Sequence, residues 1–268
     1  MLLPPLYPII DFSCFAAKSD PIMAIVRYAE ELIAAGVTLI QLRDKSVASV
    51  ANHSTQENSA GQNRENPTRR FLGCARELRR VTSDRATLII NDRIDICLAA
   101  DADGVHLGQD DLSPAAARRI FDNVFSQLHR TPTPWVPHPF AANPLQSSEI
   151  ESERVGGNAA VTPGKKPLIG FSTHNLSQVI EADVLPIDYI AIGPVFATGS
   201  KANPDPVVGL EGVRQARQAT RKPLVAIGGI TRQNCSQVKA AGADAVAVIS
   251  DLLESPAKAV ADFLRVLG

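Results

Sequence analysis

The sequence alternates between short apolar runs and longer segments with helical periodicity, and this alternation limits the fold more than any other feature. Runs rich in Val, Ile and Leu predict strands that are buried on both faces, as in a parallel sheet covered by helices. The predicted strands span 6–10, 37–43, 86–91, 104–107, 167–171, 188–192, 223–227 and 245–249. The predicted helices span 22–35, 69–80, 93–100, 113–125, 175–182, 210–220, 231–241 and 255–267.

Eight strand–helix units in strict alternation predict an α/β fold that closes on itself as a single (β/α)8 TIM barrel spanning 1–268. A length of 268 residues is ordinary for such a barrel. The alternative is an open, doubly wound sheet. It is disfavoured because the units number eight and no Gly-x-Gly-x-x-Gly follows the first predicted strand.

Two segments without periodicity interrupt the alternation, at about 46–68 and about 126–166. The first is rich in Asn, Ser and Gln, and the second is rich in proline, so both are interpreted as loop insertions. The first follows the carboxyl end of a strand, which is the catalytic face of a TIM barrel. The second follows a helix, which predicts that it emerges at the opposite face.

Composition excludes several functional classes. The net charge of -1 without a basic block argues against a general nucleic-acid binder. No apolar run is long enough to cross a membrane, and the proline-broken start of the chain is a poor signal peptide. Four dispersed cysteines do not form a disulfide scaffold. We therefore expect a cytoplasmic protein whose partners are small molecules, while a homo-oligomer remains an open alternative.

The second predicted strand ends in a polar run where catalytic residues of such barrels lie. The run is Gln41-Leu42-Arg43-Asp44-Lys45. Side chains alternate along a strand, so Gln41, Arg43 and Lys45 should face the barrel mouth together. Their charges suit an anionic ligand such as phosphate. The alternative is a charge cluster in contact with solvent only.

The next two predicted strands end in carboxylates. Asp92 follows the third strand, and Asp111 follows the fourth. Carboxylate oxygens from neighbouring strand ends could converge on Mg²⁺, which commonly accompanies substrate phosphates. The alternative is that either aspartate caps the helix that follows it. His106, inside the fourth apolar strand, is predicted to be a core histidine rather than a ligand.

The last three strands end in residues that suit a phosphate group. The sixth strand leads into the run 193–201, where hydroxyls, a glycine and a lysine lie close together, although a plain surface loop is the alternative. The seventh strand is followed by Gly228 and Gly229, and Ser250 follows the eighth. Loops after strands seven and eight usually hold phosphate in this fold, and glycine lets backbone N–H groups approach it.

Taken together, these strand-end motifs resemble the thiamine-phosphate synthase family. They are QLRDK at 41–45, ND at 91–92, GQDD at 108–111, GFSTH at 170–174, GPVFATGSK at 193–201 and GGI at 228–230. They occur in the family's order, and the resemblance covers essentially the whole chain except the two insertions.

The resemblance implies an alkyl or aryl transferase with one Mg²⁺ per active site. The family joins 4-amino-2-methyl-5-hydroxymethylpyrimidine diphosphate to a hydroxyethylthiazole phosphate, giving thiamine phosphate and pyrophosphate. It is thought to proceed through a pyrimidine carbocation that the thiazole nitrogen attacks, which requires no strong protein nucleophile.

The resemblance also implies the site residues. Catalytic roles fall on Arg43, Lys45, Ser172 and Lys201. Pyrimidine diphosphate contacts fall on Gln41, Leu42, Arg43, Asp44, Lys45, Asn91, Ser172 and Lys201. Thiazole phosphate contacts fall on Thr198, Gly199, Ser200, Gly229, Ile249 and Ser250, and Mg²⁺ ligands on Asp92 and Asp111.

Two other functions stay open. A thiazole tautomerase uses the same barrel and resembles this chain at the Ser-x-His segment and the Gly-Gly turn, and a catalytic His174 would favour it. That enzyme lacks the Asn-Asp pair and the GQDD run that this chain carries. A non-catalytic sensor of thiazole phosphate is the second alternative, and it would not need a metal pair and three basic residues.

Overall fold

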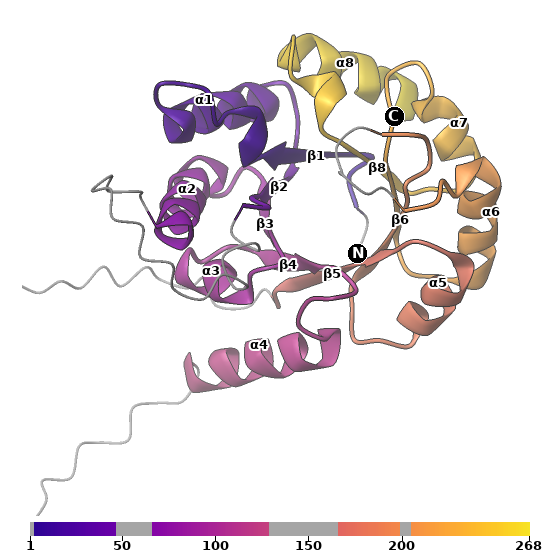
Figure 1. Ribbon diagram of the computed structural model, residues 1–268, viewed down its shortest axis with the longest axis horizontal. Coiled ribbons are helices and arrows are strands. Elements are labelled where there is room, and N and C mark those ends of the chain that lie inside the picture. The colour runs from indigo at the N-terminus through magenta and orange to yellow at the C-terminus, as the bar shows by residue number, and fades with distance from the viewer. Residues whose placement is uncertain (1–2, 47–65, 129–165, 199–204) are drawn as a thin grey trace, which may run out of the picture.

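A computed structural model describes residues 3–46, 66–128, 166–198 and 205–268. Eight strands form a closed barrel in chain order, and every neighbouring pair is parallel. The helices form a ring outside the strands (Figure 1). The prediction of a TIM barrel is confirmed.

The strands and helices alternate as the sequence predicts. The strands are β1 (Leu6–Asp11), β2 (Leu39–Arg43), β3 (Thr87–Asn91), β4 (Gly104–Leu107), β5 (Leu168–Thr173), β6 (Tyr189–Ile192), β7 (Leu224–Ile227) and β8 (Ala245–Val248). The helices are α1 (Pro21–Ala34), α2 (Pro67–Thr82), α3 (Ile94–Ala99), α4 (Pro114–Leu128), α5 (Leu176–Asp183), α6 (Gly209–Ala219), α7 (Cys235–Ala240) and α8 (Pro256–Leu267). Short 3-10 helices follow β1 (η1, Phe12–Cys14) and β8 (η3, Ser250–Leu252).

Side-chain alternation along the strands produces two hydrophobic cores. One lies between the strands and the helices and contains Ile10, Leu42 and Ile90. The other fills the barrel interior and contains Ile9 and Ile89, one residue away from members of the first. Burying one such side chain contributes about 1.5–3 kcal/mol. The two cores fix the register, and the register decides which strand-end residues face the mouth.

The barrel interior also accommodates the large ring of Tyr189. Tyr189 of β6 is fully buried and pairs in register with Gly170 of β5. A Cβ atom placed on Gly170 would overlap the Tyr189 ring. Glycine at this position therefore provides the space that the ring occupies inside the barrel.

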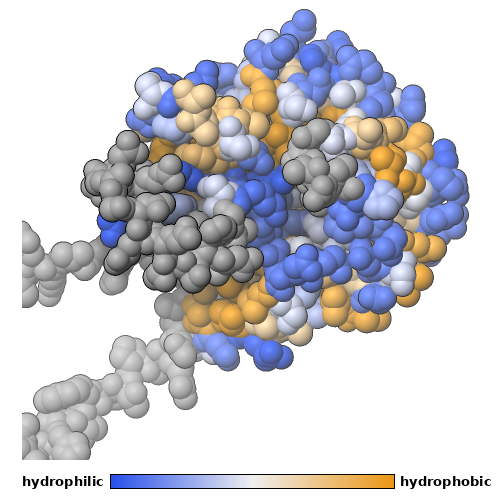
Figure 2. All heavy atoms as spheres, in the orientation of Figure 1, coloured by the Kyte–Doolittle hydropathy of each residue, from blue (hydrophilic) through white to orange (hydrophobic). Residues whose placement is uncertain are grey.

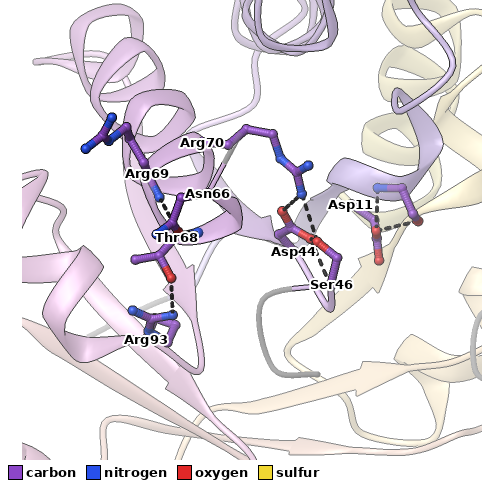
Figure 3. A network of polar contacts seen from close by, with 9 residues as sticks. Asp11, Asp44, Ser46, Asn66, Thr68, Arg69, Arg70 and Arg93 are labelled. Carbon is purple, nitrogen blue, oxygen red and sulfur yellow. Dashed lines mark hydrogen bonds and ion pairs between the residues drawn. The ribbon is translucent and has the colours of Figure 1, made fainter. Parts of the chain in front are cut away.

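Some boundaries differ from the sequence prediction. Helix α2 begins at Pro67, inside the segment assigned to the first insertion, because Asn66 Oδ1 caps it by accepting from Thr68 N at 2.9 Å (Figure 3). Helix α4 continues to Leu128, into the segment assigned to the second insertion. The remainder of both insertions, 47–65 and 129–165, lies outside the described residues.

Helix α7 is shorter than predicted, because it begins at Cys235. The turn before it is closed by Asn234, whose Oδ1 accepts from Thr231 N at 2.8 Å. Within the described part of the chain, no helix combines the length and apolar character needed to cross a membrane.

Candidate active site

The barrel opens at the carboxyl ends of its strands into a cavity of about 660 Å³, a volume typical of small-molecule sites. Hydrophilic residues gather around the centre of the molecular face in Figure 2. The predicted site residues that line the cavity are Gln41, Arg43, Lys45, Asn91, Asp92, Asp111, Ser172, Thr198, Gly229, Ile249 and Ser250.

At the end of β2, alternate side chains point either into the cavity or outward, away from it. Gln41, Arg43 and Lys45 line the cavity, as alternation predicts. Leu42 is fully buried in the core beneath the helices. Asp44 is also directed away from the cavity, and its Oδ2 accepts from Arg70 Nη2 at 2.9 Å (Figure 3). The structure therefore gives Leu42 and Asp44 no contact with the cavity, in contrast to the roles implied for them by the resemblance.

Arg43 brings a nearly buried positive charge to the mouth. Its Nε lies 3.4 Å from Asp11 Oδ2, and both side chains are 10% exposed. Among the described residues, no hydrogen bond satisfies that Nε. A buried guanidinium with one loosely placed counter-ion favours an anionic ligand, because an anion would compensate the charge.

Two carboxylates meet at the ends of β3 and β4. Burial raises the pKa of Asp111, and the neighbouring Asp92 carboxylate raises it further. Lys45 Nζ lies 2.9 Å from Asp92 Oδ2. Asp92 has a φ of 62°, a left-handed conformation that aspartate and asparagine tolerate better than most residues.

Neither aspartate caps the following helix. The cap position of α3 belongs to Arg93, which makes no side-chain cap. Asp111 Oδ2 accepts from Gly108 N at 2.7 Å, and Ser113 Oγ accepts from Ala116 N at the start of α4. The helix-cap alternative is therefore wrong for both.

The pair fits a hard divalent cation. The Asp92 carboxylate raises the cost of ionising Asp111, and a cation between the two would remove that cost. Lys45 supplies a positive charge at this point. No group of three or more potential ligands occurs within the described ranges, but Mg²⁺ commonly takes one or two carboxylates together with phosphate oxygens.

The floor of the cavity is a buried chain of hydrogen bonds. His106 Nε2 lies 2.9 Å from Ser172 Oγ, and its Nδ1 lies 3.1 Å from Tyr189 OH. Tyr189 OH lies 2.8 Å from Tyr7 OH, which accepts from Gln41 Nε2 at 2.9 Å. The chain therefore links two residues that line the cavity, Gln41 and Ser172.

His106 is buried, as predicted for a core histidine, but it also lines the cavity. Burial lowers its pKa to about 4, and the charge of Lys45 contributes, so the ring is neutral at ordinary pH. Burial raises the pKa of both Tyr7 and Tyr189 above the usual range. Sequence reasoning missed these two tyrosines, because a tyrosine within an apolar strand looks like a core residue.

On the side of the mouth formed by the loops after β6 and β7, the cavity is lined partly by backbone atoms. Gly228 and Gly229 have φ values of 100° and 62° and pack against the loop that follows β6. Val195 N donates to Ile227 O at 2.9 Å, and Phe196 N donates to Gly228 O at 3.0 Å. These contacts position Thr198 at the cavity.

The loops after β7 and β8 are also joined. Arg232 N donates to Asp251 Oδ2 at 2.8 Å. Within the described part of the chain, the amide hydrogens of Gly229 and Ser250 donate to no other residue, which leaves both for a ligand. Gly199, Ser200 and Lys201 lie outside the described residues.

Comparison with known proteins identifies the family. A family model described as thiamine monophosphate synthase matches residues 12–125 and 158–252. This chain belongs to that family. The thiamine-phosphate synthase of Koribacter versatilis is 40% identical over 265 residues, covering 99% of this chain and 96% of the relative. The thiamine-phosphate synthase of Methanoregula boonei is 35% identical and covers 94% of this chain and 86% of its own.

Solved structures agree with the family assignment. A thiamine phosphate pyrophosphorylase from Pyrococcus furiosus superposes with a TM-score of 0.65 at 26% identity, covering 98% of this chain and 95% of that one. The (S)-3-O-geranylgeranylglyceryl phosphate synthase of Thermoplasma acidophilum has a TM-score of 0.56 at 14% identity, which shows a shared fold only. The family predicted from the strand-end motifs is confirmed.

Proposed function

We propose that this chain is a transferase that couples an aminopyrimidine methyl diphosphate with a thiazole phosphate, producing thiamine phosphate and pyrophosphate. The observation that carries the proposal is the division of one cavity into two anion sites. Charged side chains stand at the ends of β2 to β4. At the loops after β7 and β8 stand the backbone amides of Gly229 and Ser250, which donate to no other described residue. Two phosphorylated substrates can occupy these two sides and meet over the floor.

In the coupling, the C–O bond between the pyrimidine methylene and the diphosphate breaks, and the thiazole nitrogen forms a new C–N bond. Negative charge develops on the leaving pyrophosphate, so cations help most if they contact it there. Arg43 and Lys45 line the cavity, which supports that role for them, and the resemblance assigns it to Lys201 as well. The remaining contribution of the protein is positioning, because the nucleophile belongs to the substrate.

Asp92 and Asp111 would hold Mg²⁺ beside this diphosphate side. When bound, the ion would neutralise part of the charge on the diphosphate oxygens. Arg43 then contributes a nearly buried positive charge, whereas Lys45 can move from Asp92 to the substrate once the carboxylates are occupied.

The test is to supply the purified chain with both substrates and Mg²⁺ and to measure thiamine phosphate and pyrophosphate. We expect equal amounts of the two products, and none when either substrate is omitted. Isomerisation of a thiazole carboxylate phosphate without coupling would support the tautomerase alternative. Tight thiazole phosphate binding without turnover would support a sensor.

His174 bears on the tautomerase alternative. Its Nδ1 lies 2.7 Å from Gly193 O, and because a carbonyl oxygen only accepts, Nδ1 carries a proton and donates. Asp205 lies 3.5 Å from the same nitrogen. This nitrogen is engaged by the loop after β6, which suits a structural role, although His174 also borders the cavity.

A further inference from the structure

The hydrogen-bond chain beneath the cavity has a direction. Gln41 Nε2 donates to Tyr7 OH, so the Tyr7 oxygen already accepts one hydrogen bond. The Tyr7 hydroxyl hydrogen is then free to donate to Tyr189 OH, the remaining partner within reach among the described residues. If Tyr189 donated to Tyr7 instead, the Tyr7 hydrogen would be buried without an acceptor, which is costly.

The direction of the hydrogen bonds is also fixed from Tyr189 to Ser172. Tyr189 accepts from Tyr7, so its own hydrogen is donated to His106 Nδ1. The neutral ring of His106 must then carry its proton on Nε2, which donates to Ser172 Oγ. Ser172 thereby receives a hydrogen bond and keeps its hydroxyl hydrogen for the cavity that it lines.

At the Gln41 end of the hydrogen-bond chain, the nitrogen of the side-chain amide has a partner and the oxygen does not, among the described residues. Its Nε2 is engaged by Tyr7, and its Oε1 accepts no hydrogen bond from the described residues. Gln41 lines the cavity, so this oxygen is available to a ligand. The floor of the cavity therefore offers an acceptor at Gln41 and a donor at Ser172, coupled through three buried side chains.

We propose that Tyr7, Tyr189 and His106 are positioning residues whose fixed hydrogen-bond direction makes the site selective for an aminopyrimidine ring over its oxo counterpart. This proposal rests on the proposed function. An aminopyrimidine presents an amine donor beside a ring-nitrogen acceptor, which matches the Gln41 oxygen and the Ser172 hydroxyl. The corresponding oxo ring presents a carbonyl acceptor beside a ring N–H donor, which opposes both. A site that must leave buried polar groups unpaired rejects such an analogue strongly.

The first test determines which ring nitrogen of His106 carries the proton, and it requires no activity measurement. Histidine in the purified chain is labelled with ¹⁵N, and the His106 signals are assigned by comparison with His106→Gln. We expect a proton on Nε2 and none on Nδ1 around neutral pH. A proton on Nδ1 would reverse every bond in the chain and overturn the proposal.

The second test measures selectivity. The amino substrate and its 4-oxo analogue, both as diphosphates, are compared in Tyr189→Phe. Without the Tyr189 hydroxyl, His106 is free to adopt the other tautomer, and Ser172 can then turn its oxygen to the cavity. We expect kcat/KM for the amino substrate to fall by about tenfold and its preference over the oxo analogue to fall by at least about tenfold, with KM for thiazole phosphate unchanged.

Further variants separate positioning from packing. Tyr7→Phe should reduce the preference in the same way, because it frees the Gln41 amide. His106→Gln keeps an N–H near the position of Nε2 and should retain more activity than His106→Leu. Tyr28→Phe is the matched control: it removes a hydroxyl from a buried tyrosine that packs against Phe15 outside the barrel interior, and it should leave the preference unchanged.

The outcomes separate the two proposals. If the wild-type protein couples nothing but carries its His106 proton on Nε2, the proposed function is wrong and the proposed direction of the hydrogen bonds still holds. A chain that couples its substrates while Tyr189→Phe and Tyr7→Phe keep the full amino preference would retain the function and overturn the positioning role.

Discussion

The two sides of the barrel mouth present different chemical groups to the cavity. At the ends of β2 to β4, the groups that line the cavity are side chains: Arg43, Lys45, Asp92 and Asp111. At the loops after β7 and β8, they are backbone amides placed by Gly229 and by the turn into η3. The first side depends on charge, and the second depends on shape.

This difference has a practical meaning. Changes of charge that keep side-chain size should damage the β2 to β4 side and leave the fold intact. Changes of size that keep charge should damage the glycine side instead.

The largest effect is expected from Asp92→Asn. The substitution removes one ligand charge from the carboxylate pair, while asparagine keeps the side-chain size and tolerates the left-handed φ of 62°. We expect kcat to fall by at least about a hundredfold, on the scale of losing one strong electrostatic contact, with an unchanged circular dichroism spectrum.

Asp111→Asn should show the same loss. The double variant should be little worse than either single one, because both changes remove one metal. Full Mg²⁺-dependent activity in either single variant would contradict a shared ion. The titration of activity against Mg²⁺ provides the measurement. Asp84→Asn is the control, because Asp84 shares the left-handed backbone of Asp92, with a φ of 58°, but does not line the cavity.

The glycine side is tested by Gly229→Ala. A Cβ at this position would lie 2.6 Å from Ala197 O and 2.8 Å from Phe196 Cβ, so the loop after β6 must move. We expect KM for thiazole phosphate to rise by about tenfold or more, while KM for the pyrimidine diphosphate changes little, as measured by steady-state kinetics with each substrate varied.

Gly209→Ala is the matched control for this variant. Gly209 has a φ of 64°, close to the 62° of Gly229, but no atom lies within 4 Å of its would-be Cβ. It carries the same conformational cost of about 1 kcal/mol without the collision. An equal rise in KM for both variants would show that strain, rather than crowding of the phosphate site, is responsible.

A smaller effect is expected from breaking the ion pair between Arg70 and Asp44, the residue that precedes Lys45. Arg70 donates to Asp44 and to Ser46 Oγ at 2.8 Å (Figure 3). Its guanidinium lies 4.3 Å from the Phe12 ring centroid. Arg70→Met leaves the buried Asp44 without its counter-ion, so we expect the free energy of unfolding to fall by about 1–3 kcal/mol and activity to fall severalfold.

A double-mutant cycle with Asp44→Asn measures this contact. If Asp44 and Arg70 stabilise the fold as an ion pair, the double variant should be more stable than Arg70→Met, because no unpaired charge remains. Purely additive losses, measured by urea denaturation, would mean that the pair has no coupling.

The smallest expected effect concerns stability in the absence of metal. The pKa of Asp111 is raised by burial and by Asp92, so the ionised carboxyl costs stability. Its favourable contribution is fully present below the ordinary pKa of an aspartate and is lost as pH rises through the raised pKa. With a chelator at neutral pH, Asp111→Asn should therefore be more stable than the wild type, by less than about 1 kcal/mol because the carboxyl is only half-buried.

Thermal melts across pH provide the check. The advantage of Asp111→Asn should disappear in acid, where the wild-type carboxyl is protonated. A variant that is less stable than the wild type at neutral pH would show that the Gly108 N–H bond to Asp111 outweighs the repulsion from Asp92.

The sequence predicted the barrel because buried parallel strands and amphipathic helices leave strong periodic patterns. It also predicted that Gln41, Arg43 and Lys45 share the mouth, because alternation follows from strand geometry alone. The same alternation places Leu42 and Asp44 on the opposite face, which the resemblance, carried over as a continuous motif, did not separate.

The floor of the site could not be predicted in this way. Tyr7 and Tyr189 are 182 residues apart in the chain, and their hydroxyls meet only because the barrel closes. His106 was correctly assigned to the interior, but its bond to Ser172 depends on the register between neighbouring strands. Periodicity reports which face a residue occupies, and it contains no information about which residue lies opposite.

Gly170 has a consequence for how relatives of this chain vary. The Tyr189 ring fills the space that a side chain at position 170 would need, so a larger residue at one position requires a smaller residue at the other. An alanine at the first position requires a smaller residue at the second, and loss of the phenol also removes the hydroxyl that orients His106. The pair should therefore covary across an alignment of relatives. Members that keep glycine and tyrosine together should retain the strict amino preference, and members that have replaced both should orient the serine by another contact.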